Sequence, residues 1–285
     1  MSGLRTRPLV EPDVPSAGEV LAAPRPRRRS VLGRVLASAG PPLALVVVLS
    51  AGWQLMTIRL DSPLVPGLPE IWDAFVRIAQ SGLLWQSLEV TLLRVALGFA
   101  LAFVIAVAVG IAMGRNVWVR RFLEPLVLLG LVVPGLVKAL LGVIWFGISL
   151  VNPVLVVAMA AAPALIINLT QGVRSVDPAL LEMAHVYRFS RRTRLRRLWV
   201  PALAPGLFAG ARLGVALSWK VIVLVEIFGL ADGVGYQLNL EFTQHHVAGV
   251  LAWTIAFAGV MTLIEYGVLQ TLERRSARWR REVSV

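Results

Sequence analysis

Six apolar segments, each long enough to cross a lipid bilayer, constrain this chain more than any other feature. A membrane-spanning helix needs about 20 mainly apolar residues. Hydrophobic residues make up 57% of the chain and charged residues only 15%, a balance unlike that of soluble domains. We therefore predict an all-α integral membrane protein whose six spans lie near residues 40–58, 88–114, 123–148, 151–173, 204–229 and 248–271.

Two of these spans contain proline. Pro134 interrupts the third and Pro163 the fourth, and we predict a tight turn between the two spans at Asn152–Pro153. Neighbouring helices can satisfy the carbonyl groups that proline leaves free, so such breaks are compatible with spans inside a bundle.

Arginine is distributed unevenly over the connections between the spans. The N-terminal tail, the loop after the second span, the loop 174–201 and the C-terminus together hold 22 arginines, whereas the opposite loops hold only Arg59 and Arg77. Loops rich in Lys and Arg remain in the cytoplasm. The pattern therefore predicts a multi-pass membrane protein with both termini and the loop 174–201 in the cytoplasm.

The two ends of the chain differ from its apolar middle. Residues 1–39 are rich in Pro and Arg and lack an apolar run long enough for the core of a signal peptide. We interpret them as a disordered basic cytoplasmic tail, followed by a transmembrane domain over 40–273 and a basic cytoplasmic C-terminus over 274–285.

The overall charge and the absence of cysteine exclude several classes of function. A net charge of +12 could suggest nucleic acid, but the arginines form blocks between apolar spans, so the lipid bilayer is the expected partner and nucleic acid is not. The chain contains no cysteine, which excludes disulfides, thiolate nucleophiles and cysteine metal sites.

The loop 174–201 is far longer than a turn between two spans requires. Asp177 can cap a helix and Pro178 fits its first position, and a second short helix could start at Ser190. Spacings of three and four place one apolar face of the first helix at Leu180, Leu181 and Ala184. Such a helix suits docking of a soluble partner; the alternative is a basic loop that only sets the topology.

The spacing in this loop resembles the cytoplasmic "EAA" loop of ABC-importer permeases. That pattern is Glu-Ala-Ala, three residues, Gly, nine residues, Ile, one residue and Leu-Pro, and the matching positions here are Glu182, Met183, Ala184, Arg188, Leu198, Val200 and Pro201. Arg188 replaces the loop glycine, which is favoured where a helix ends in a left-handed residue. A side chain there costs roughly 1 kcal/mol, so either the turn is built differently or the chain absorbs this cost.

Other fragments are similar to the nitrate, sulfonate and taurine branch of these permeases. They are Ser87–Gly98 at the second span, Leu207–Gly214 followed by Trp219 and Glu226 at the fifth, and Gly233–Tyr236 in an external loop. The resemblance as a whole covers about residues 40–275. The resemblance implies a six-helix type I ABC-importer permease bundle with a cytoplasmic coupling helix.

The same resemblance implies a transport subunit rather than an enzyme. Two permease copies as a homodimer, or one copy with a relative, would enclose the path in the cell (inner) membrane. An extracytoplasmic binding protein would deliver a small solute of the nitrate, sulfonate or taurine kind, or an uncharged heterocycle, and ATP and Mg would bind to ABC ATPase subunits. This chain itself has no G-x-x-x-x-G-K-[ST] sequence, and we expect no cofactor, metal or catalytic residue in it. The expected ATPase-docking residues are Asp177, Leu181, Glu182, Ala184, Arg188 and Arg191.

Charged residues within the spans are candidates for the solute pathway. Counted along the helical rise, Arg94, Lys138, Lys220 and Glu226 all fall in the outer half of the bundle. Charges inside a membrane are costly and usually face a partner or a cavity. Two interpretations stay open: Glu226 pairs with a cation of another helix, or the excess of cations forms a vestibule that favours an anionic solute.

Two other kinds of membrane protein are alternatives. An ion-coupled secondary transporter should show inverted repeats and carboxylates near the bilayer midplane, and an integral membrane enzyme should show a cluster of catalytic or metal-binding residues at one interface. Neither is evident in the sequence.

His245 and His246 in the last external loop are better explained as a surface pair than as a metal site. A helix over part of 59–87, with Ile71, Phe75 and Ile78 on one face, is expected on the outer surface.

Single cysteines test the predicted orientation, because the chain has none. In intact cells, Gly67→Cys and His245→Cys should react with a membrane-impermeant thiol reagent, whereas Ser190→Cys should react only after the cells are opened. Labelling at position 190 in intact cells without labelling at position 67 would reverse the orientation.

Overall fold

The computed structural model describes residues 31–269 and residue 271 of the chain. The chain is divided into two compact units, Met1–Trp53 and Gln54–Val285. In the first unit, the described residues belong to helix α2 (Val31–Leu60). This helix therefore includes residues 31–39, which we assigned to the tail. Residues 1–30 of that tail and the basic C-terminus 274–285 lie outside the described residues.

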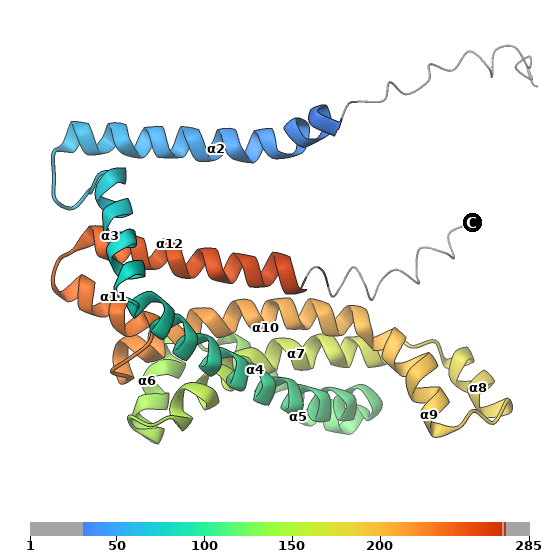
Figure 1. Ribbon diagram of the computed structural model, residues 1–285. Helices are drawn as coiled ribbons and strands as arrows, with labels where there is room; N and C mark the ends of the chain where they lie inside the picture. The colour runs from blue at the N-terminus through green and yellow to red at the C-terminus, as the bar shows by residue number, and fades with distance from the viewer. Residues whose placement is uncertain (1–30, 270, 272–285) are drawn as a thin grey trace, which may run out of the picture. The chain divides into compact units, whose positions relative to one another are not determined.

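The second unit is a set of helices connected by short turns (Figure 1). Two π-helical turns, Leu195–Trp199 and Ile264–Leu269, continue α9 and α12. The helices are α3 (Leu68–Gln80), α4 (Leu83–Arg115), α5 (Val117–Val132), α6 (Gly135–Phe146), α7 (Val151–Arg174), α8 (Pro178–Val186), α9 (Arg191–Arg194), α10 (Val200–Gly229), α11 (Val234–Thr243) and α12 (Val247–Leu263).

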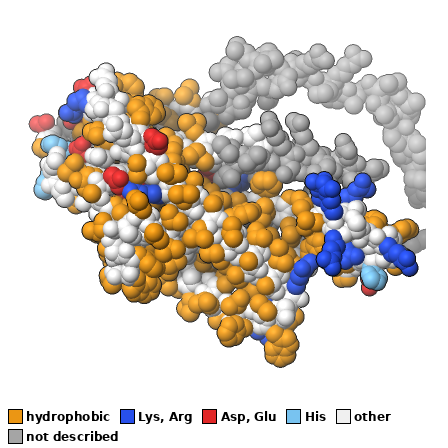
Figure 2. Space-filling model, turned by 60° about the horizontal axis from the view of Figure 1, so that its bottom comes forward, with side chains coloured by type: hydrophobic (Ala, Val, Ile, Leu, Met, Phe, Trp, Pro, Cys, Tyr) orange, Lys and Arg blue, Asp and Glu red, His pale blue; other side chains and the backbone are white. Residues whose placement is uncertain are grey.

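Most of the predicted spans are single helices. Among the described residues, five helices are long and apolar enough to cross a membrane, and a sixth span results if the bent pair α5–α6 is one span. Their lipid-compatible surface is visible in Figure 2, where hydrophobic side chains cover the middle of the molecule. A bilayer requires that backbone polar groups find hydrogen-bond partners within the protein, and helices meet this requirement.

Helix α7 is the centre of the second unit, and α4 and α10 pack along it. Small residues allow this close approach. On α4 they recur at every fourth position, at Gly98, Ala102, Ala106, Gly110 and Gly114. A Cβ atom at Gly98 would lie 2.5 Å from Val157 Cβ of α7, and one at Gly206 of α10 would lie 2.8 Å from the carbonyl oxygen of Asn168. The three helices therefore meet backbone against backbone, in a core rich in alanine.

The structure corrects our account of the prolines. The predicted third span is not a single helix, because α5 and α6 meet at 101° across Val133–Pro134. The turn that follows lies at residues 147–150 rather than at Asn152–Pro153, which belong to the first turn of α7. Proline is tolerated there because the first N–H groups of a helix have no intrahelical partner. At Pro163, α7 continues without a break.

The helix predicted within residues 59–87 is confirmed as α3. Ile71 is buried against α12, and Phe75 and Ile78 pack beside it. In Figure 1, α3 and α11 lie at one end of the second unit, whereas α8 and α9 lie at the opposite end, beyond α7 and α10. The second unit therefore has two distinct ends, and each of them carries polar groups.

Candidate functional site

The loop 174–201 folds as its local signals predict. Asp177 caps α8, since its Oδ1 atom accepts a hydrogen bond from the backbone N–H of Ala179 at 2.8 Å, and Pro178 is the first helical residue. Ser190 caps α9 in the same manner through the N–H of Thr193. These bonds satisfy donors that a helix start leaves free, so both short helices have defined beginnings.

The turn after α8 shows which of the two alternatives for Arg188 is correct. Its φ angle is +48°, its N–H donates to the carbonyl of His185, and the N–H of Phe189 donates to the carbonyl of Ala184, both at 3.0 Å. This is the Schellman arrangement that normally places glycine at the left-handed position. The turn therefore has the backbone geometry that glycine would adopt, and the chain absorbs the cost of an arginine side chain there.

One face of α8 packs against the chain's own residues. Ala184 is completely buried, together with Val176 and Leu198, and the partly buried Leu181 and Phe189 surround them. The docking candidates Leu181 and Ala184 therefore face inward and hold the helix in place. Leu180, which we predicted to share this face, is instead 47% exposed.

The opposite side, which we call the outer face of α8, is apolar and exposed. It consists of Leu180, Met183, Val186 and Tyr187, whose exposures run from 40% to 74%. The docking candidates Asp177, Glu182, Arg188 and Arg191 are also exposed. Sequence reasoning did not place Met183, Val186 and Tyr187 on an exposed apolar face, although Val186 and Tyr187 lie three and four residues after Met183, which was a usable signal.

Basic side chains concentrate at the end of the molecule that carries α8 and α9. Figure 2 shows Lys and Arg gathered there and mixed charges at the other end. Arg115, at the end of α4, places its guanidinium 5.0 Å from the ring centre of Trp199, close to the start of α10. The loop after the second span and the loop 174–201 thus lie at the same end, as the distribution of arginine predicts.

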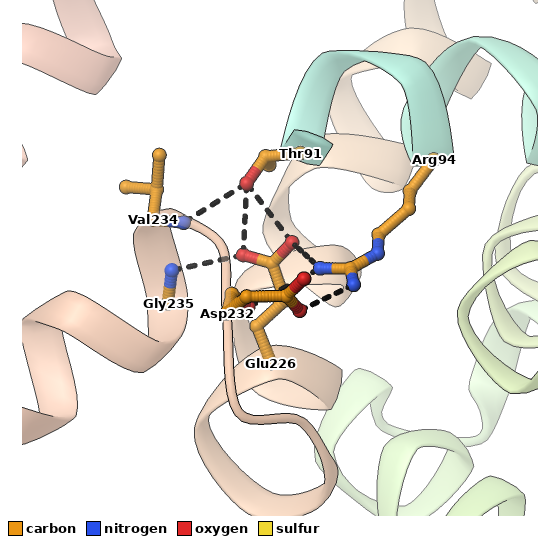
Figure 3. Close-up of polar contacts among 6 residues, drawn as sticks. All are labelled: Thr91, Arg94, Glu226, Asp232, Val234 and Gly235. Carbon is orange, nitrogen blue, oxygen red and sulfur yellow. Dashed lines mark hydrogen bonds and ion pairs between the residues drawn. The ribbon is translucent and has the colours of Figure 1, made fainter. Parts of the chain in front are cut away.

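A buried carboxylate near the opposite end connects α4, α10 and the loop that follows (Figure 3). Glu226 of α10 is completely buried. It accepts hydrogen bonds from the Thr91 hydroxyl at 2.9 Å, from Arg94 Nη1 at 2.9 Å and from the N–H of Gly235 at 2.9 Å. The pairing interpretation for Arg94 and Glu226 is therefore confirmed.

Arg94 also binds a second carboxylate. Its Nη2 atom donates to Asp232 Oδ1 at 2.5 Å and its Nη1 atom to the Asp232 carbonyl at 3.2 Å. Asp232 is 60% exposed, and nothing in its sequence context marked it as the partner of a residue 138 positions away. Two carboxylates thus offset the single charge of Arg94, so this cluster has no excess of positive charge.

The two lysines of the spans differ from Arg94 and from each other. Lys138 of α6 is buried, and its Nζ atom donates to the carbonyl of Gly130 in α5 at 2.5 Å. Lys220 of α10 is exposed, with its Nζ atom 5.8 Å from the ring centre of Trp219. Within the described residues, neither lysine has a carboxylate within 4.0 Å.

His245 and His246 lie at the surface beyond α11. His246 Nδ1 is 3.5 Å from Glu241 Oε2, so one of the two imidazole rings has a carboxylate partner. In the part of the chain that the structure describes, no group of three or more His, Asp or Glu side chains could hold a metal ion.

Comparison with known proteins places these features in a family. Residues 90–278 match the family model described as the binding-protein-dependent transport system inner membrane component. The chain belongs to this family. As a permease of this kind, it is the membrane subunit of an ABC importer and not an enzyme, and nucleotide binds to a separate ATPase subunit. The ion-coupled and enzymatic alternatives are thereby set aside.

Relatives of this permease align over most of its length. The putative aliphatic sulfonates transport permease protein SsuC of Bacillus subtilis is 31% identical over 84% of this chain and 87% of the relative. The taurine transport system permease protein TauC of Escherichia coli is 32% identical, over 84% and 89%. The riboflavin transport system permease protein RibX of Chloroflexus aurantiacus is also 32% identical, over 89% and 95%.

Removing Arg94 should strongly destabilise this permease. Arg94→Met leaves the buried carboxylate of Glu226 without its counter-charge, and breaking a buried ion pair in this way costs about 3–5 kcal/mol. Thermal unfolding of the purified protein in detergent measures the effect. Asp232→Asn is the matched control, and it should cost far less because Asp232 is mostly exposed. Equal stability of Arg94→Met and the wild type would contradict the assigned role.

Arg188→Gly should stabilise the cytoplasmic loop by up to about 1 kcal/mol, because glycine adopts a positive φ without steric cost. Arg191→Gly, the same change at the first residue of α9, should not stabilise it, since glycine weakens a helix. Limited proteolysis of the loop compares the variants. Transport-linked ATP hydrolysis separates the roles of Arg188: an unchanged rate dismisses it as an ATPase contact, and a reduced rate supports that contact.

Proposed function

We propose that the outer face of α8 is the surface on which the ABC ATPase docks and through which ATP binding is transmitted to the transmembrane domain. The observation that carries this proposal is an exposed apolar face, Leu180, Met183, Val186 and Tyr187, on a short helix at the basic end of the molecule. Exposed apolar patches rimmed by polar residues are typical of protein–protein contacts. Glu182 on α8 and Arg188 in the turn that follows it form part of the polar rim.

The attachment of α8 to the chain supports a mechanical role. Its inner face packs on Leu198, which lies in the π-helical turn that leads directly into α10. Packed elements move together because protein interiors are close-packed. Displacement of α8 by closure of the ATPase pair would therefore be passed to α10, whose far end is fastened to α4 through Glu226. ATP binding would open the path outward, and hydrolysis would reset it.

The complete importer contains further partners. We propose a homodimer of this permease that encloses the path, one ATPase on each α8, and an extracytoplasmic binding protein at the end that carries α3 and α11. Both termini and α8 would lie in the cytoplasm, in the cell (inner) membrane. Arginine placement and the contact of Arg115 with Trp199 support this orientation.

The solute is proposed to be small and to carry a negatively charged group of the sulfonate kind. Two of the relatives are named for aliphatic sulfonates and taurine, whereas another is named for riboflavin, so relationship alone does not select one solute. Among our pathway candidates, Arg94 and Glu226 are engaged with each other, which leaves Lys138 and Lys220 as the cations available to an anion.

Substitutions on α8 test the docking surface. Met183→Asp places a charge in the centre of the outer face and should weaken ATPase binding by about 10- to 100-fold, as expected for a central apolar contact. Glu182→Lys should also weaken it by reversing a charge at the rim. Co-purification of the ATPase with the tagged permease measures the loss.

A matched control separates docking from general damage. Phe242→Asp makes the same kind of change at a 70% exposed position of α11, at the other end of the molecule, and should leave ATPase recovery intact. Wild-type recovery and full transport with both Met183→Asp and Glu182→Lys would refute docking at α8.

A further inference from the structure

The three cations among our pathway candidates occupy different environments. The positive charge of Arg94 is offset by the carboxylates of Glu226 and Asp232. Lys220 is exposed beside Trp219. Lys138 is the one among them that is both buried, at 8% exposure, and without a carboxylate within 4.0 Å in the described part of the chain. A lysine inside a membrane is costly and usually marks a partner or a pathway.

The position of Lys138 follows from the break between α5 and α6. In a continuous helix, the carbonyl of Gly130 would accept the N–H of the residue four positions on. That residue is Pro134, which has no N–H. Lys138 Nζ takes its place on the Gly130 carbonyl. The side chain therefore satisfies the acceptor that proline frees and lies directly at the 101° bend.

This hydrogen bond leaves most of the capacity of the lysine unused. An ammonium has three donors, and the structure gives Lys138 Nζ one protein acceptor, a neutral carbonyl. A neutral amide side chain could donate the same bond. The positive charge is therefore in excess of what the bend requires, and an anion close to Lys138 would supply its missing counter-charge in a medium of low dielectric, where such attraction is strong.

We propose that Lys138 is a specificity-determining residue that attracts the negatively charged group of the transported solute as it passes the α5–α6 bend. This inference rests on the proposed anionic solute and deepens that proposal, because it assigns the anion preference to one side chain. Lys138 need not bind the solute tightly. A single buried positive charge lowers the barrier to entry of an anion and does nothing comparable for an uncharged molecule.

Three variants of Lys138 separate its charge from its hydrogen bond. Lys138→Gln retains a donor for Gly130 and removes the charge, Lys138→Arg retains the charge, and Lys138→Met removes both. Each is reconstituted with the ATPase and the binding protein, and ATP-driven uptake is measured with ethanesulfonate as the anionic probe and riboflavin as the uncharged one. Lys220→Gln is the control for loss of a charge elsewhere in the spans.

We expect Lys138→Gln and Lys138→Met to lower ethanesulfonate uptake by at least about tenfold, with ATPase association unchanged, while Lys138→Arg and Lys220→Gln stay close to the wild type. Wild-type uptake in Lys138→Gln would show that the hydrogen bond alone matters and would overturn the proposal. Loss of the permease dimer in Lys138→Met would also overturn it, because the counter-charge would then belong to the second copy. So would ATP-driven uptake of riboflavin alone by the wild type.

A second measurement does not depend on transport. Lys138 and Lys220 are the only lysines in the chain, so mass spectrometry reads their reductive methylation separately in the assembled importer. Ethanesulfonate should slow the modification of Lys138 and leave that of Lys220 unchanged, and equal rates at Lys138 with and without the probe would overturn the proposal. Absence of ATP-driven uptake of both probes by the wild type would count against the proposed solute class, and the methylation rates would still decide the role of Lys138.

Discussion

Close packing of α4 and α10 against α7 is the constraint on which the other features of the transmembrane domain depend. In a bilayer the lipid is as apolar as the side chains, so helices associate through van der Waals packing rather than through the hydrophobic effect. Small residues at every fourth position of α4, from Gly98 to Gly114, bring two backbones together. The proximity of α4 and α10 then places Arg94 within reach of Glu226.

The charged residues of the spans show how this packing assigns roles. Glu226 is completely buried, yet its oxygens receive bonds from Thr91, Arg94 and the N–H of Gly235. A buried carboxylate with this many donors is compensated, and it fastens α4 and α10 to the loop that leads into α11. Lys138 has no comparable set of partners among the described residues, and its neutral acceptor explains why it stands apart as a candidate for the solute path.

The opposite end of the domain combines a firm attachment with an exposed surface. Asp177 and the Schellman turn at Arg188 define both ends of α8, and Ala184 and Leu198 hold it against the start of α10. A coupling element has to be rigid toward its own chain and open toward its partner. Helix α8 meets both conditions, since its outer face remains exposed while its inner face is buried.

Much of this architecture could be read from the sequence because the signals involved are local. Apolar length indicated the spans, arginine placement grouped the loops that Arg115 and Trp199 now bring together, and Asp177, Pro178 and Ser190 marked helix starts that the structure contains. Arg188 was recognisable as an unusual residue for its turn, since backbone geometry at a helix end depends on a few neighbouring residues.

Other features were decided by tertiary structure, because they depend on which helices become neighbours. The sequence left open whether Glu226 had a partner, and Asp232 became the second partner of Arg94 only through the return of the chain after α10. Whether Leu180 is buried or exposed depended on which side of α8 packs against Val176 and Leu198. The sharp bend at Pro134, the turn before Asn152 and the bond from Lys138 to Gly130 likewise required three-dimensional packing. Sequence alone thus determined most of the long helices and the starts of α8 and α9, whereas only the packed fold decided which of their charges would meet a partner, since partners in space need not be close in the chain.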